Sequence, residues 1–334
     1  MNAAGAQPLL FLKAEEIARL MPVAECIEVM DGAMAALARG QVHQPLRTIV
    51  RPPGAAGLLG LMPAYIAGET PLYGAKAAGF FPGNADLGMD PHQGCVLLFS
   101  GMTGALLAVM DASEITGIRT AAMTGLATRL LARPDARRVA LIGSGHQAHW
   151  QLQAVAAVRS LEWVRVCGRD AARAQAFVER EQPSYGFAIS AAMSVEEAVL
   201  DADIVVTVTN ATEPFLQAEW VAPGTHINAV GSSTPSHCEI ATDLMGQARL
   251  FVDRRESTLS ESGDYLRAAQ AGCVTPHSLL AEIGEVVIGA HPGRSDARDV
   301  TLFKSLGMAL EDVATAQVLY ERARTTKTGT WLSL

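Results

Sequence analysis

The hydrophobic pattern of the chain changes near residue 45. From Lys13 to Arg39, apolar residues recur every three or four positions, which predicts helix, and Gly40 closes it. Pro22 interrupts this pattern, and a break is expected there because proline lacks an amide proton and clashes in a helix interior. Between Pro45 and Ala108, short β-type runs separated by Pro and Gly predict an antiparallel or mixed sheet. These runs are Thr48–Val50, Leu58–Leu59, Ala75–Ala77 and Val96–Phe99.

Beyond this region the chain alternates strand and helix. Glu114–Arg133 is predicted to be helix and Pro134–Ala136 a turn, so a domain boundary is expected near here. From Arg138 onward, the alternation predicts βαβ units and a parallel sheet. An amphipathic helix is expected at about Ser305–Arg324, packing back on the first domain. The alternating segments are Val139–Ile142, His146–Arg159, Val164–Cys167, Ala171–Glu181, Ile204–Thr209, Ile227–Val230 and Leu250–Val252.

These patterns predict an α/β protein with two domains. The 334 residues exceed one average domain and leave ample surface to bury. We expect an α+β domain over residues 1–120, with residues 305–334 packing back on it. Residues 121–304 are expected to form a Rossmann-type domain with a doubly wound parallel sheet.

The composition narrows the class of protein. A net charge of -8, without any run of Lys and Arg, argues against a nucleic-acid partner. The five cysteines lack a C-x-x-C spacing, which predicts buried thiols and no metal site. No charge-free stretch reaches membrane-spanning length, and Met1–Leu12 lacks a basic region followed by an apolar core. We therefore expect a cytoplasmic protein with no membrane partner.

A glycine-rich turn follows the first strand of the second domain. The sequence Gly143-Ser144-Gly145-His146-Gln147-Ala148 comes directly after Val139–Ile142 and precedes an alanine-rich helix. The first glycine permits a tight turn, the second lets the backbone approach a pyrophosphate, and Ala148 takes the third small position. Amide groups at the helix start would hold the phosphates, so we favour nucleotide binding over a purely structural turn. Further cofactor contacts are expected at Thr209, Val230 and Gly231.

The end of the second strand bears on the choice of cofactor. An enzyme that uses NAD usually places an Asp or Glu there to bind the ribose 2′-hydroxyl. This chain has Gly168-Arg169-Asp170 instead, and the guanidinium of Arg169 suits a 2′-phosphate. We therefore expect NADPH/NADP rather than NAD. The alternative is that Arg169 is a solvated turn residue and Asp170 the N-cap of the following helix, which would leave the cofactor open.

The sequence resembles the ornithine cyclodeaminase and μ-crystallin family. The similarity extends over nearly the whole chain and includes Pro82-Gly83-Asn84 and His92-Gln93-Gly94 in the first domain. It implies a homodimer whose subunits join through the amino-terminal domain, and a substrate held between that domain and the dinucleotide domain. The segments that carry the resemblance are Arg119-Thr120-Ala121-Ala122, Gly143–Ala148, Ile227-Asn228-Ala229-Val230-Gly231 and Leu302-Phe303-Lys304-Ser305-Leu306-Gly307.

The resemblance also implies roles for three basic residues. Arg47 and Arg119 match the arginines that hold the substrate carboxylate, and Lys76 matches the lysine that exchanges a proton with the substrate. A guanidinium binds a carboxylate bidentately, and a partly desolvated ammonium is a natural acid for an imine nitrogen. Arg51 competes with Arg47 for its role, Arg47 could be a surface charge, and Lys76 could reach solvent from a sheet edge. The apolar surroundings of Arg119 require a partner for its charge, which a substrate carboxylate would supply.

One position departs from the cyclodeaminase pattern. Members that cyclise ornithine carry an Asp two residues after the glycine that matches Gly231, where this chain has Ser233. A serine hydroxyl lacks the basicity to activate a substrate amine, so Ser233 is expected only to line the substrate site.

The resemblance therefore favours reduction of a cyclic ketimine, Δ1-pyrroline-2-carboxylate or Δ1-piperideine-2-carboxylate, to L-proline or L-pipecolate. Ornithine cyclodeamination and a linear amino-acid dehydrogenase of the alanine dehydrogenase type stay as alternatives. A third alternative is a protein that binds NADPH and a small ligand without turnover, as in the μ-crystallin branch.

Overall fold

The structure is a computed structural model that describes residues 8–89 and 92–333. Residues 1–7, which form part of the segment expected to lack a targeting sequence, lie outside the described residues. The chain divides into two compact units. The first comprises Met1–Arg119 and Met308–Leu334, and the second comprises Thr120–Gly307. Helix α3 (Ala112–Leu131) begins in the first unit and continues into the second.

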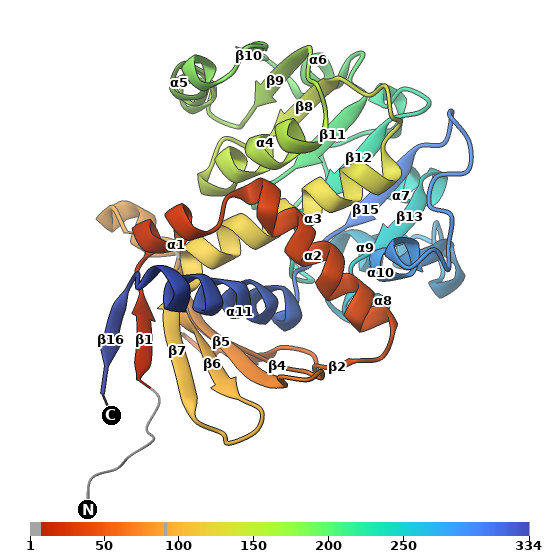
Figure 1. Cartoon of the computed structure of the whole chain (residues 1–334). Coiled ribbons are helices and arrows are strands. Elements are labelled where there is room, and N and C mark those ends of the chain that lie inside the picture. The colour runs from red at the N-terminus through yellow and green to blue at the C-terminus, as the bar shows by residue number, and fades with distance from the viewer. Residues whose placement is uncertain (1–7, 90–91, 334) are drawn as a thin grey trace, which may run out of the picture. The chain divides into compact units, whose positions relative to one another are not determined.

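A mixed sheet organises the first unit (Figure 1). Its strand order is β16-β1-β7-β6-β5-β4-β2, and β3 pairs with β4. The β1–β7 pair is parallel and the other pairs are antiparallel, so the mixed-sheet expectation is confirmed. The strands are β1 (Leu9–Leu12), β2 (Val42–His43), β3 (Thr48–Val50), β4 (Leu58–Ile66), β5 (Leu72–Phe80), β6 (His92–Ser100), β7 (Leu106–Asp111) and β16 (Thr330–Leu332).

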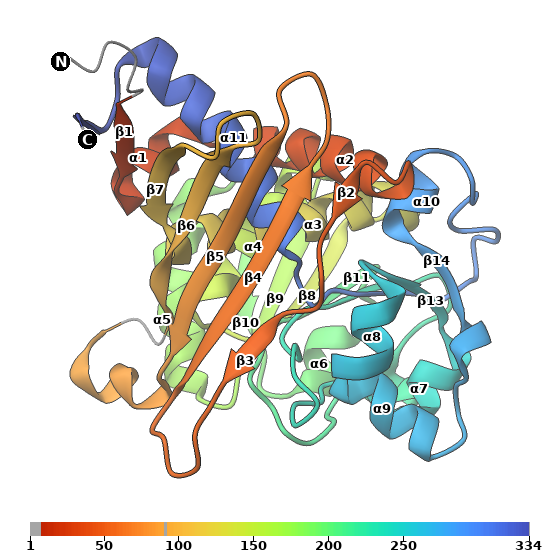
Figure 2. The ribbon, with the colours of Figure 1, turned by 90° about the horizontal axis from the view of Figure 1, so that it is seen from below.

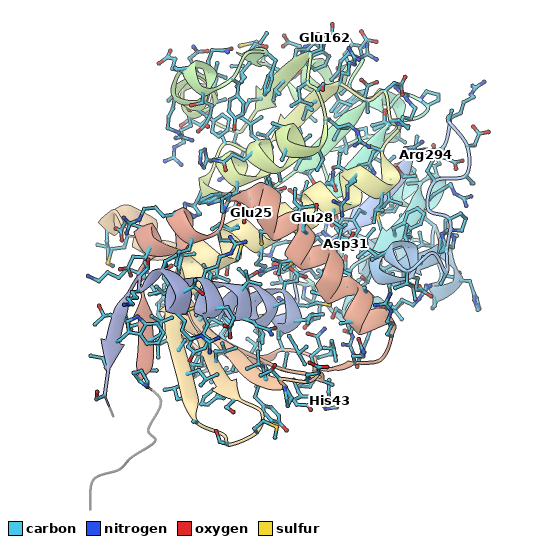
Figure 3. All side chains as sticks on the ribbon, viewed as in Figure 1. Glu25, Glu28, Asp31, His43, Glu162 and Arg294 are labelled. Carbon is cyan, nitrogen blue, oxygen red and sulfur yellow. The ribbon has the colours of Figure 1, made fainter. Side chains whose placement is uncertain are left out.

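Helices of the first unit cover one face of this sheet. The predicted break at Pro22 is confirmed, because α1 (Ala14–Leu20) ends before it and α2 (Val23–Ala38) begins after it. Helix α11 (Ala309–Thr326) packs on β4, β5 and β6, and Figure 2 shows these strands from their opposite face. Along α2, Glu25, Glu28 and Asp31 lie about one turn apart (Figure 3). A short 3-10 helix, Pro82–Leu87, follows β5.

Helix α11 begins later than the sequence pattern predicts. We expected it from Ser305, but the structure starts it at Ala309. The amides of Leu306 and Gly307 donate to the Asp253 carboxylate, and Gly307 has a positive φ of 78°. These amides are therefore held in a non-helical segment. An amphipathic pattern does not reveal this competition, because it records only which positions are apolar.

The second unit contains a parallel sheet with the order β10-β9-β8-β11-β12-β15-β13-β14. Successive residues of β8 alternate between two buried clusters, with Val139 and Leu141 in one and Ala140 and Ile142 in the other. Both faces are thus covered, which confirms the doubly wound α/β prediction. The strands are β8 (Arg138–Ile142), β9 (Trp163–Cys167), β10 (Ala188–Ala191), β11 (Ile204–Thr207), β12 (His226–Ala229), β13 (Arg249–Val252), β14 (Leu279–Glu282) and β15 (Thr301–Lys304).

The connections of the second unit are mostly helical. None of the helices in residues 8–89 and 92–333 is long and apolar enough to cross a membrane. The α-helices are α4 (His146–Val158), α5 (Ala171–Glu181), α6 (Val195–Val199), α7 (Thr242–Gln247), α8 (Arg255–Glu261), α9 (Gly263–Gln270) and α10 (Ile283–Val287). The 3-10 helices are Gln182–Ser184, Ala218–Trp220 and Pro276–Ser278.

Candidate active site

In the first unit, Lys76 lies in a buried charged cluster. Strand β5, which carries it, is internal to the sheet, so the alternative that Lys76 reaches solvent from a sheet edge is wrong. The residue is 6% exposed. Its Nζ lies 2.8 Å from Asp312 Oδ2 and donates to Thr116 Oγ1 at 3.3 Å. A buried ammonium is therefore held by one carboxylate and one hydroxyl.

Arg119 on α3 joins the same cluster. Its Nε donates to Asp312 Oδ1 at 2.9 Å, and its Nη1 donates to Glu311 Oε2 at 2.7 Å. We expected a substrate carboxylate to supply the partner for this charge, but the chain itself supplies two carboxylates. Nη2 makes no hydrogen bond to the described residues, so part of the guanidinium is still available to a ligand. The cluster contains two cations and two anions.

Close packing of α11 on β5 builds this cluster. A Cβ on Gly74 would lie 2.5 Å from Val313 Cγ2, so only glycine lets the helix approach this closely. Glu311 and Asp312 lie in the first turn of α11, where the helix dipole favours negative charge, and Glu311 Oε1 accepts from Met308 N at 3.1 Å. Sequence reasoning missed both acids. An acid pair just after Gly307 was the available signal, but the predicted helix start placed it in the helix interior.

The pKa values of the two cations in the cluster shift in opposite directions. Burial, followed by the charge of Arg119, lowers the pKa of Lys76 to about 8 despite Asp312 and Glu311. Burial also lowers the pKa of Arg119, but Asp312 and Glu311 outweigh it, so this pKa is raised. Arg119 therefore stays charged, while Lys76 can exchange a proton near neutral pH.

Strand register distinguishes the two candidate arginines near β3. Continuing the β3–β4 pairing by one residue from Thr48 places Arg47 opposite Met62, which lies opposite Lys76. Arg51 is four positions further along, about 13 Å at the rise of a strand. Arg47 is half-buried and Arg51 is exposed. The register therefore favours Arg47 as the arginine that accompanies Lys76, and its half-buried side chain does not fit a plain surface charge.

In the second unit, the glycine-rich turn has the geometry that a dinucleotide requires. Gly143 has φ 123°, and a Cβ there would lie 2.7 Å from Val208 O. Gly145 is the N-cap of α4 without a side-chain cap, and a Cβ on it would meet nothing within 4 Å. The backbone there is accessible, and Ala148 is fully buried against the sheet. Gln147 Oε1 is buried without a hydrogen-bond partner in the described part of the chain. These features fit a pyrophosphate at the start of α4.

Ser144 in this turn lies close to the end of β9. His146, the first residue of α4, is exposed. A Cβ on Gly168 would lie 3.1 Å from Ser144 Oγ, so the turns after β8 and β9 lie close together. Asp170 caps α5 by accepting from Ala172 N at 2.9 Å, as one alternative anticipated. Arg169 is exposed. A 2′-phosphate at this strand end would therefore find an accessible guanidinium.

Three expected cofactor residues follow later strands of the sheet. Thr209 follows β11, and Val230 and Gly231 follow β12, so all lie at the carboxyl edge, as does Gly143 after β8. The Thr209 hydroxyl is not turned toward a ligand, because it donates to Glu239 Oε1 at 2.8 Å.

Two further residues complete this edge of the sheet. Ser233 is half-buried in the segment after β12. Sequence reasoning missed Glu239, a fully buried carboxylate behind these segments. In residues 8–89 and 92–333, no group of three His, Cys, Asp or Glu residues is arranged to hold a metal ion.

Comparison with known proteins identifies the family. Residues 8–327 match the ornithine cyclodeaminase/mu-crystallin family. The chain belongs to that family. It is 41% identical over 315 residues to the ketimine reductase mu-crystallin of Mus musculus, covering 93% of this chain and 96% of that protein.

Two solved structures agree with this assignment. The Thermococcus litoralis Δ1-pyrroline-2-carboxylate reductase, in complex with NADH and L-proline, has a TM-score of 0.93 and 35% identity, covering 96% of this chain and 99% of that one. An archaeal alanine dehydrogenase dimer with bound NAD has a TM-score of 0.91 and 33% identity, covering 98% and 99%. The chain is therefore an NAD(P)H-dependent oxidoreductase of the class that acts on C=N and CH–NH bonds.

Proposed function

We propose that this protein, as a homodimer, uses NADPH to reduce Δ1-pyrroline-2-carboxylate or Δ1-piperideine-2-carboxylate to L-proline or L-pipecolate. The observation that carries the proposal is the buried cluster of Lys76, Arg119, Glu311 and Asp312. It combines a proton donor whose pKa is lowered to about 8 with a permanently charged guanidinium. A cyclic imino acid presents the matching groups, an imine nitrogen beside a carboxylate.

The first unit would bind the substrate. Arg119 uses Nε and one Nη1 hydrogen for its two acids, which leaves Nη2 for the substrate carboxylate. Arg47, which the strand register places in line with Met62 and Lys76 across the sheet, would bind the same carboxylate. Lys76 Nζ would give its proton to the imine nitrogen, and the neutral amine would regain a proton from solvent after product release.

The second unit would bind the cofactor through Gly143–Ala148, Arg169, Thr209, Val230 and Gly231. When bound, NADPH supplies a hydride to the imine carbon. Hydride at carbon and the Lys76 proton at nitrogen together convert C=N to CH–NH. Ser233 would line the substrate side of this edge. Because its hydroxyl cannot act as the base that ornithine cyclisation requires, we favour reduction of an imine over deamination of ornithine.

The opposite face of the first sheet suits pairing of two chains. Apolar side chains on β3, β4 and β5 are exposed there, without a helix over them in Figure 2. Such a patch on a protein surface commonly marks an interface. The residues are Val50, Leu59, Leu61 and Tyr73.

A substrate screen tests this function. The purified chain, supplied with NADPH, should oxidise the cofactor in the presence of either cyclic imino acid and run as a dimer in light scattering. Pyruvate with ammonia should be a poorer substrate, and ornithine with NAD should release no ammonia. Turnover confined to the linear substrate, ammonia release from ornithine, or a monomeric mass would each contradict the corresponding part of the proposal.

The cofactor preference rests on Arg169. Replacing Arg169 by alanine should lower kcat/KM for NADPH by about 10- to 100-fold and leave that for NADH unchanged, because a charge-assisted contact to the 2′-phosphate is lost. Arg298→Ala is a matched control, since Arg298 is an exposed arginine just before β15, at the amino edge of the same sheet. A wild-type protein that uses NADH as well as NADPH would refute the preference.

A further inference from the structure

Glu239 is a fully buried carboxylate that none of the proposed steps uses. Five donors surround it, three of them backbone amides and two of them hydroxyls. Oε1 accepts from Thr209 N at 2.7 Å and from Thr209 Oγ1 at 2.8 Å. Oε2 accepts from Thr207 Oγ1 at 2.9 Å, Gly231 N at 2.8 Å and Ser232 N at 3.3 Å. One side chain therefore ties the segment after β11 to the segment after β12.

The two segments pack too closely for any side chain between them. A Cβ on Gly231 would lie 2.1 Å from Thr209 O and 2.5 Å from Glu239 Oε1. Glycine at this position is thus required first by the backbone of Thr209 and then by the carboxylate of Glu239. The segments meet through backbone atoms, and the carboxylate accepts hydrogen bonds from both of them.

The backbone of Glu239 is itself held by a second buried acid, Asp264. Asp264 Oδ1 accepts from Glu239 N at 2.7 Å and from Ile240 N at 3.0 Å. Its Oδ2 lies 2.9 Å from Nζ of Lys304, the last residue of β15, and both side chains are at most 1% exposed. The buried acids therefore connect the ends of three parallel strands, β11, β12 and β15.

These contacts leave Glu239 no capacity for a ligand. A carboxylate offers about four lone-pair sites, and five donors already occupy them. A buried acceptor in this state acts by holding the groups that donate to it. Three of the five donors belong to Thr209 and Gly231, which are themselves expected to contact the cofactor.

The strand order indicates which half of the cofactor these segments would serve. The adenosine end belongs at β9, where Gly168 and Arg169 lie. A dinucleotide extends from there across the crevice at the point where the strand order reverses, past β8 toward β11 and β12. The nicotinamide half would therefore lie over the segments that Glu239 holds.

We infer that Glu239 is a positioning residue that sets the nicotinamide half of the cofactor site through Thr209, Gly231 and Ser232. The adenosine half depends on the turns after β8 and β9, whose residues are not among the hydrogen-bond donors to the Glu239 carboxylate. The inference rests on the binding of a nicotinamide cofactor at this edge, which is part of the proposed function, and not on the identity of the imino acid.

Glu239→Gln tests the inference, because it keeps the shape but turns an amide group toward one of the backbone N–H donors. We expect the Kd for NADPH to rise about tenfold or more, while the Kd for 2′-phospho-ADP-ribose, which lacks nicotinamide, changes by less than about twofold. Isothermal titration of both ligands, and of NADH with ADP-ribose, measures this difference without any substrate.

Asp203→Asn provides the matched control. Asp203 is 5% exposed and also accepts five hydrogen bonds, from Arg133, Arg137 and Arg138. It lies at the amino edge of the same sheet, directly before β11. We expect this variant to lose stability without changing the ratio of the two Kd values.

Two results would overturn the inference: equal weakening of NADPH and 2′-phospho-ADP-ribose by Glu239→Gln, or the same selective loss in Asp203→Asn. If Glu239→Gln does not fold, Thr207→Val removes a single donor to Oε2 with little change of shape. The ratio of the Kd for NADPH to the Kd for 2′-phospho-ADP-ribose in that variant then tests the inference. A wild-type protein that binds NADPH but reduces no ketimine would refute the proposed function and leave this inference standing.

Discussion

Replacing Lys76 by methionine is expected to lower kcat for ketimine reduction by about 10²- to 10⁴-fold, because the proton donor to the imine nitrogen is lost. KM should change much less, since the arginines still hold the carboxylate. In the wild-type protein, kcat should fall as the pH rises through about 8, because the lowered pKa of Lys76 leaves the donor deprotonated above it. The variant should lack this decrease. Steady-state kinetics between about pH 6 and 10 measure both effects.

Lys13→Met serves as the control, because Lys13 is exposed and should leave the rate and its pH profile unchanged. Near-normal turnover of Lys76→Met, with the same decrease above pH 8, would show that the proton comes from another group.

Replacing Arg119 by methionine is expected to destabilise the fold by about 3–5 kcal/mol, because the buried carboxylates of Glu311 and Asp312 both lose the guanidinium that bonds them. Adding Glu311→Gln restores one cation to one anion. The double variant should therefore regain much of the stability, but it should still bind the imino acid weakly. Denaturant unfolding and KM, measured on both variants, separate the two roles of Arg119.

The two measurements can fail independently. If Arg119→Met unfolds at the same denaturant concentration as the wild type, the four charges do not depend on one another. If the double variant recovers a normal KM, Arg119 holds its neighbouring acids and no substrate carboxylate.

The strands and helices that carry a strong local pattern were predictable. The strand Val139–Ile142 and the turn after it follow one another directly, so neighbouring residues suffice to predict them. The break at Pro22 was predictable for the same reason, because it follows from the proline itself. Strands β10, β14 and β15 were missed, because each has only four residues, and a run that short shows too little periodicity to distinguish a strand from a helix.

The sequence by itself determined the family, the parallel sheet and the glycine turn, since each depends on residues adjacent in the chain or on a motif. Only the tertiary structure decided that Arg119 bonds Asp312, 193 positions away, and that Glu239 ties two strand ends together. Such pairings depend on which buried surfaces pack together. A buried charge needs a partner, but the sequence does not show which distant residue will be that partner. The close contacts of α11 with β5 and of Gly231 with Thr209 arise only when the chain is folded.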